Sequence, residues 1–148
     1  MWYIILIFFH LLFATIWVGG HLLLSIGYLP KALKLKDESI ILSFESIYEK
    51  IGIPSLIGQL ITGLLLFFNR INDYSLFFNW NDFTGRHFIL KIVLLLLTIG
   101  LAIHARLRII PELNKNNLWI LTIHIISVTI IGILFIFVGI SIRFSIFY

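Results

Sequence analysis

Histidines are the residues of this sequence with the most informative chemistry, because all five lie within or at the ends of long apolar segments. An imidazole can carry a proton near neutral pH and can bind a metal ion or haem iron. Keeping an ionisable group in lipid costs free energy, so such side chains usually face a bundle interior and serve a ligand or a proton. The candidate ligands are therefore His10, His21, His87, His104 and His124.

The spacing of these histidines predicts two levels of sites. His10 and His21 are eleven residues apart, nearly three helical turns, so on a helix they share one face and lie roughly 16 Å apart. His124 enters about 10 Å from the start of its apolar segment, at a depth close to that of His21, and His104 lies nearer the surface. We therefore expect His21 to pair with His124 or His104 in an inner site.

The outer site is expected to pair His10 with His87. Lys91 lies one helical turn after His87 on the same face. A lysine near the start of a membrane segment either reaches the interface or stays in the bundle to meet an anionic group, and we favour the second role. The alternative for His87 and His104, at the two ends of their segment, is that they reach toward water.

The ligand types favour haem over copper. Reduced copper prefers sulfur ligands, whereas this chain has no cysteine and a single methionine, Met1. Paired imidazoles from facing helices suit haem iron. We expect one or two haem b groups, with copper as the alternative. Arginines near the helix ends, Arg106 among them, could bind haem propionates, although such charges also set membrane topology.

Other chemistries lack the residues that they need. The sequence contains no serine, aspartate and histidine arrangement, no phosphate-binding loop and no pair of carboxylates within an apolar segment. A hydrolase is therefore not expected, whereas a membrane oxidoreductase stays open. The basic residues flank the apolar segments, so nucleic acid is not an expected partner.

The elements that must position the histidines are membrane helices. Of 148 residues, 60% are hydrophobic and 12% charged, against about 25% charged in soluble domains. About 20 apolar residues cross the hydrocarbon core as a helix, and a β-barrel would need an alternation of polar and apolar residues that this chain lacks. The sequence predicts an all-α domain of four transmembrane helices over about residues 2–28, 51–69, 88–105 and 118–140.

Basic residues predict the orientation of this bundle. Loops that carry lysine and arginine stay on the cytoplasmic side. Seven such residues lie in the first and third connections, and three lie in the second connection and the C-terminal end. This predicts an up-down-up-down bundle in a bacterial inner membrane, with both termini on the non-cytoplasmic side. We read the first segment as a permanent helix and not as a signal peptide, because it is too long and lacks a basic leader.

The connections carry three further predictions. Leu29-Pro30 should end the first helix near Tyr28. Residues 37–50 combine apolar and acidic residues at helical spacing, which favours an extension of the second helix over a separate surface helix. Residues 70–86 form the longest external segment and are expected to make a cap.

Two stretches resemble the copper-resistance D (CopD) family of membrane proteins. Residues 10–20 read HLLFATIWVGG and are followed by Leu29-Pro30. Residues 85–91 read GRHFILK, and an apolar helix and RLRIIP at residues 106–111 follow them, which is similar to that family's glycine, lysine and terminal proline pattern. The likeness covers most of the first three helices and implies a four-helix membrane domain linked to copper uptake or export.

The arrangement is also similar to four-helix di-haem cytochromes b, including those that oxidise superoxide and pass electrons to quinone. A third likeness is to the bacterial membrane protoporphyrinogen oxidase, which has a histidine on helix one and a lysine on helix three. We expect a CopD-type haem b protein that transfers electrons within the membrane, with quinone or another redox protein as partner and a homo-oligomer left open. A copper-binding or copper-transport protein and a protoporphyrinogen-oxidase-like enzyme are the alternatives.

Overall fold

The chain folds into long helices, as the computed structural model shows for residues 1–70 and 78–144. These residues contain no strand. Four helical spans are long and apolar enough to cross a membrane: Trp2–Leu35, Ser39–Arg70, Phe83–Glu112 and Leu118–Phe144. The expected helical class and the four spanning segments are confirmed, and the chain has the features of a multi-pass membrane protein.

The first span does not end near Tyr28, so that prediction is wrong. Helix α1 (Trp2–Leu23) runs through a π-helical turn (Leu24–Tyr28) into α2 (Leu29–Leu35). Pro30 lies in the first turn of α2, where its missing N–H does least harm, and the wider turn before it accommodates the ring. The helix ends at Lys36, which adopts a left-handed conformation with φ 51°.

The second span is the 32-residue helix α3 (Ser39–Arg70). It includes most of residues 37–50, so the predicted extension of the second helix is confirmed. Asp37 precedes the helix, and its carboxylate accepts hydrogen bonds from the Ser39 side chain and amide, which lower the pKa of Asp37. Pro54 lies inside the helix.

The third span begins five residues earlier than predicted. Helix α4 (Phe83–His104) starts after Asp82, whose carboxylate accepts from the amide of Gly85 at 2.8 Å and caps the helix. His87 therefore lies in the second turn of α4 and not at its end. A π-helical turn (Ala105–Ile109) and a short 3-10 turn (Ile110–Glu112) complete this span.

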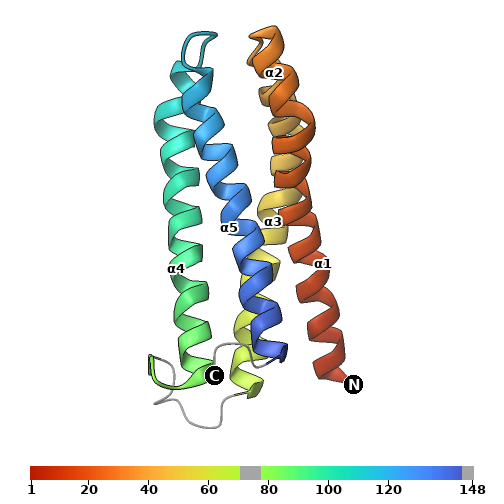
Figure 1. The fold of residues 1–148 in the computed structure, drawn as a ribbon. Helices are drawn as coiled ribbons and strands as arrows, with labels where there is room; N and C mark the ends of the chain where they lie inside the picture. The colour runs from red at the N-terminus through yellow and green to blue at the C-terminus, as the bar shows by residue number, and fades with distance from the viewer. Residues whose placement is uncertain (71–77, 145–148) are drawn as a thin grey trace.

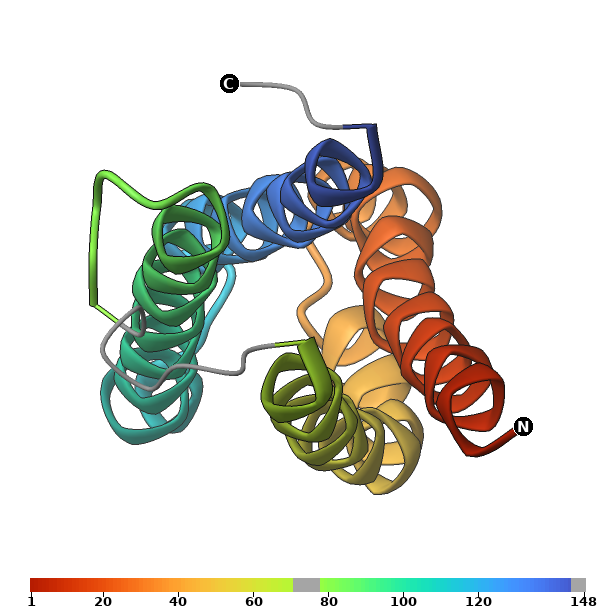
Figure 2. The same ribbon diagram turned by 90° about the horizontal axis from the view of Figure 1, so that it is seen from below.

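The fourth span is α5 (Leu118–Phe144), and Figure 1 shows it beside α1 and α4. Viewed along the helices in Figure 2, α5 lies between α1 and α4, and α3 packs against α1. Over the described residues, α3 and α4 make few contacts with each other. The helices therefore pack in the order α3, α1, α5 and α4, and the contact between α3 and α4 is the weakest.

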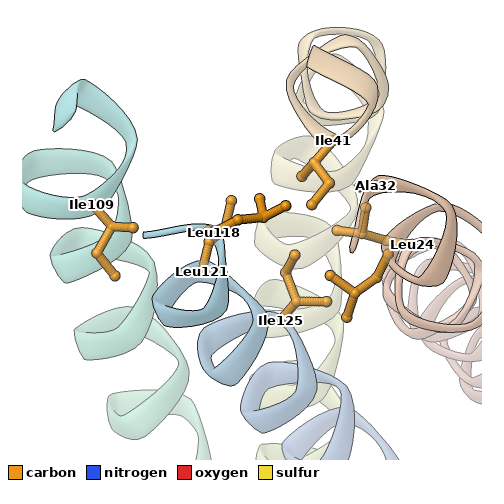
Figure 3. Close-up of a cluster of buried hydrophobic side chains, with 8 residues drawn as sticks. Leu24, Ala32, Ile41, Ile109, Leu118, Leu121 and Ile125 are labelled. Atoms are coloured by element: carbon orange, nitrogen blue, oxygen red, sulfur yellow. The ribbon is translucent and has the colours of Figure 1, made fainter. Parts of the chain in front are cut away.

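A compact apolar core lies at one end of the bundle (Figure 3). Ile41 of α3 and Leu24 and Ala32 of the first span meet Leu121 and Ile125 of α5 there. Elsewhere many large apolar side chains are exposed on the outside of the helices, as lipid contact requires. Much of the predicted cap over residues 70–86 lies outside the described residues, which omit 71–77.

Candidate functional site

A cavity of about 350 Å³ lies in the bundle and is lined by residues from all four spans. Its volume falls in the lower part of the range for small-molecule sites. Most of its lining is apolar or aromatic, and it contains two of the five histidines. The polar and aromatic residues of the lining include Trp17, His21, Tyr48, Glu49, Arg106 and His124, with Gly52 beside them.

His124 lines this cavity, and one of its two ring nitrogens can act as an acceptor or bind a metal. Its Nδ1 lies 3.0 Å from the carbonyl oxygen of Ile120, which can only accept, so Nδ1 carries the proton and donates. Nε2 of the neutral ring is then an acceptor. Histidines that bind metals commonly donate their other N–H to a backbone carbonyl, and His124 has this hydrogen bond.

His104 donates a hydrogen bond to Nε2 of His124. Its Nδ1 lies 2.9 Å from Nε2 of His124, and the two rings are stacked with centroids 5.0 Å apart. His104 is exposed and is not among the residues that line the cavity. Of the two alternatives for the inner site, His124 is therefore the one that faces it.

His21 lines the same cavity, as the inner-site prediction required. Its Nδ1 is buried and has no hydrogen-bond partner among the residues that the structure describes. The ring contacts Trp17 and Tyr48 edge-on, with centroids 5.2 and 5.7 Å away. Buried polar atoms in native proteins nearly always have a hydrogen-bond partner. The unpartnered Nδ1 of His21 is therefore unusual.

His10 belongs to a separate place in the bundle. Its Nδ1 lies 3.1 Å from the Gln59 carbonyl and 3.0 Å from the Thr62 hydroxyl, both on α3. A Cβ at Gly63 would stand 3.1 Å from Cε1 of His10, so the glycine leaves room for the ring. His10 does not line the cavity, and these contacts tie α1 to α3.

His87 does not have a nitrogen available for an outer ligand. It is 1% exposed, its Nδ1 donates to the Phe83 carbonyl at 2.6 Å, and its Nε2 lies 2.9 Å from the Ser141 hydroxyl. The expected pairing of His10 with His87 is therefore not formed in this structure. The physical reason is the early start of α4, which places His87 inside the helix pair α4–α5.

Lys91 is half-buried, and its ammonium group lies beside α5. Its Nζ approaches α5 at Gly139, where a Cβ would stand 4.0 Å away. It is also close enough to His10 for an electrostatic interaction. No anionic side chain is seen to pair with Lys91 in the described part of the chain.

Arg106 lies at the edge of the cavity and already has an anionic partner. Its guanidinium donates to the Glu49 carboxylate at 2.8 Å, and the two side chains are 59% and 37% exposed. Such exposed pairs contribute little stability, about 0–1 kcal/mol. Arg106 can therefore exchange Glu49 for another anion at low cost.

Sequence reasoning missed Tyr48 as a member of the site. Its hydroxyl donates to the Trp17 carbonyl at 2.7 Å, and its ring lies between α1 and α3. A Cβ at Gly20 or at Gly52 would collide with this ring. The signal was present as a glycine one turn after Tyr48 on the same helix, but only the packing of α1 on α3 shows which ring needs the room.

We looked for metal-ligating side chains that lie close together in space. In residues 1–70 and 78–144, no three histidine, aspartate or glutamate side chains come together as a metal-binding group. A haem needs only one or two axial nitrogens and an apolar cavity with a cation near its edge. The cavity lining includes His124 as one such nitrogen and Arg106 as a cation near its edge.

Comparison of the chain with protein-family models, with curated proteins and with solved structures finds no match.

Proposed function

We propose that this chain is an integral membrane protein that binds one haem b in the cavity between its four spans and transfers electrons within the membrane. His124 would hold the iron. Arg106 would bind a propionate in place of Glu49, and Trp17 and the apolar lining would contact the porphyrin face. The bound haem supplies one-electron redox chemistry, which the side chains of this cavity lack.

The observation that carries the proposal is the orientation of His124. Its Nδ1–H is held by the Ile120 carbonyl, which leaves Nε2 as the basic nitrogen of a histidine that lines a mostly apolar cavity. A half-buried imidazole within a membrane helix is costly unless it serves a ligand or a proton. The backbones of α3 and α4 make few contacts, and the two spans are joined by the Phe67–Phe88 ring stack and the Glu49–Arg106 ion pair.

The proposed setting is a bacterial inner membrane with both chain termini on the non-cytoplasmic side. The support is the distribution of lysine and arginine, which concentrates at the end of the bundle that carries α2 and the connection between α4 and α5. Quinone or a small oxidant or reductant that dissolves in the membrane would exchange electrons with the haem.

Absorbance spectroscopy of the purified full chain tests the proposal. A Soret peak, with sharper visible bands after reduction, and one haem per chain by extraction are expected. His124→Ala should lose the haem, whereas the matched variant His10→Ala should keep it, because His10 bonds to Gln59 and Thr62 away from the cavity. A colourless protein that carries copper, or a His124→Ala variant that retains all its haem, would overturn the proposal.

A further inference from the structure

All five histidines lie on helices, and four of them have a hydrogen-bond partner for Nδ1, whereas His21 has none among the described residues. Nδ1 of His87 and of His124 each donates to the carbonyl four residues earlier, in Phe83 and Ile120. His21 does not make the corresponding bond. Its Nδ1 is buried without a partner within the described parts of the chain.

Tyr48 accounts for this difference. The carbonyl four residues before His21 belongs to Trp17, and the Tyr48 hydroxyl donates to it at 2.7 Å. The same carbonyl accepts the backbone N–H of His21 within helix α1. A carbonyl oxygen has two lone pairs, so neither remains for the imidazole of His21.

The packing of α1 on α3 holds Tyr48 in this place. Gly20 and Gly52 lie on the two sides of its ring, and a Cβ at either would collide with it. Trp17 and Tyr48 both contact the His21 ring edge-on, which restricts its rotation. The hydrogen bond to Trp17 is therefore built into the helix interface and is not an incidental surface contact.

We propose that Tyr48 sets the tautomer of His21, so that His21 directs an Nε2–H donor into the cavity and binds a small ligand of the iron instead of the iron itself. The inference rests on the proposed function. A neutral imidazole has one N–H, and burying it at Nδ1 without an acceptor costs more free energy than placing it at Nε2. His21 and His124 then have opposite roles, as donor and as axial ligand.

This assignment names the class of ligand. It is a small molecule that binds ferrous iron and has an atom that accepts a hydrogen bond, such as dioxygen or nitric oxide. His124 would then hold the iron, and His21 would donate a hydrogen bond to the small ligand. The earlier expectation that His21 and the α5 histidine both bind iron is replaced by this arrangement.

The haem-free chain gives the first test. Histidine labelled with ¹⁵N distinguishes protonated from bare ring nitrogens by NMR in detergent micelles. His21 should carry its proton on Nε2 in the wild type and on Nδ1 in Tyr48→Phe, because the freed Trp17 carbonyl then accepts it. Tyr28→Phe is the matched control, since the Tyr28 ring contacts Phe44 and is not part of the cavity lining.

The haem-loaded chain gives the second test, with carbon monoxide as the probe. The reduced wild type should be five-coordinate and high-spin and should bind carbon monoxide. In Tyr48→Phe, Nε2 of His21 becomes basic and competes for the iron, so the spectrum should become low-spin. If His21 occupies that position most of the time, the apparent affinity for carbon monoxide falls about tenfold or more. His21→Leu should keep its haem and stay high-spin.

Two results would overturn the inference. One is a wild-type His21 protonated on Nδ1, and the other is a low-spin wild type whose spectrum Tyr48→Phe leaves unchanged. Failure of the proposed function is distinguishable from both. A chain that takes up no haem but shows the tautomer switch between wild type and Tyr48→Phe rejects the haem and supports the control of His21 by Tyr48.

Discussion

The imidazole of His104 donates from Nδ1 to Nε2 of His124 over 2.9 Å, with the two rings stacked 23° from parallel. This hydrogen bond covers the nitrogen that we assign to the iron. Because Nδ1 of His124 is held by Ile120, the ring has no second basic nitrogen to offer. Haem binding must therefore displace His104, which makes the exposed histidine a competitor of the cofactor.

His104→Leu should tighten haem binding about five-fold, because a net hydrogen bond of about 1 kcal/mol is no longer broken on binding. The dissociation constant is measured by titrating the haem-free chain and following the Soret band. His10→Leu serves as the control, since its bonds lie on α3 outside the cavity. Weaker binding by His104→Leu would instead identify His104 as the ligand.

Gly20→Ala should reproduce the effect of removing the Tyr48 hydroxyl. A Cβ at Gly20 collides with the Tyr48 ring and must push it from its place beside Trp17. The neighbouring Gly19→Ala is a matched control, because nothing lies within 4 Å of a Cβ there. In reduced, haem-loaded protein the first variant should become low-spin, and the second should match the wild type. Equal spectra for both would contradict the proposed packing role of Gly20.

Glu49→Gln should strengthen haem binding by a few-fold. The substitution removes the partner of Arg106 and leaves the guanidinium free for a propionate, and the exposed pair is worth about 0–1 kcal/mol. Glu112→Gln changes the charge equally at the same end of the bundle, but Glu112 is not part of the cavity lining. Titrations at low and high salt should show the gain shrinking with salt for Glu49→Gln. An identical gain in both variants would indicate a general charge effect.

Ser141→Ala should destabilise the fold by about 1 kcal/mol without affecting haem content. The Ser141 hydroxyl is fully buried and meets Nε2 of His87, and its removal leaves that nitrogen without this partner. Ser46→Ala is the control, because the exposed Ser46 hydroxyl only bonds to its own helix at Ser43. Thermal or denaturant unfolding in micelles measures the difference. Loss of haem in Ser141→Ala with unchanged stability would restore His87 as a ligand candidate.

Single introduced cysteines test the orientation, because the natural chain has none. Lys115 and Asn81 are both exposed and lie in connections at opposite ends of α4. In intact cells a membrane-impermeant maleimide should label Asn81→Cys at once and Lys115→Cys only after permeabilisation. The reverse pattern would place the termini on the cytoplasmic side.

The sequence by itself determined the four spans and the deep placement of the histidines. Both depend on composition along the chain, because lipid selects uninterrupted apolar helices and excludes most ionisable groups. The extension of the second helix over residues 37–50 could also be predicted, since periodicity is a local property. The end of the first span and the start of α4 could not be predicted. They depend on backbone conformation, namely the π-helical turn before Pro30 and the cap by Asp82.

Tertiary structure alone decided which histidines share a site. Helical spacing placed His10 and His21 on one face, but it carries no information about which neighbour each ring meets. The packing of α1 on α3 places Nδ1 of His10 against the Gln59 carbonyl, and it lets the Tyr48 hydroxyl donate to the Trp17 carbonyl. Availability of a ring nitrogen depends on hydrogen bonds between residues far apart in the chain, and no pattern along the sequence records those bonds.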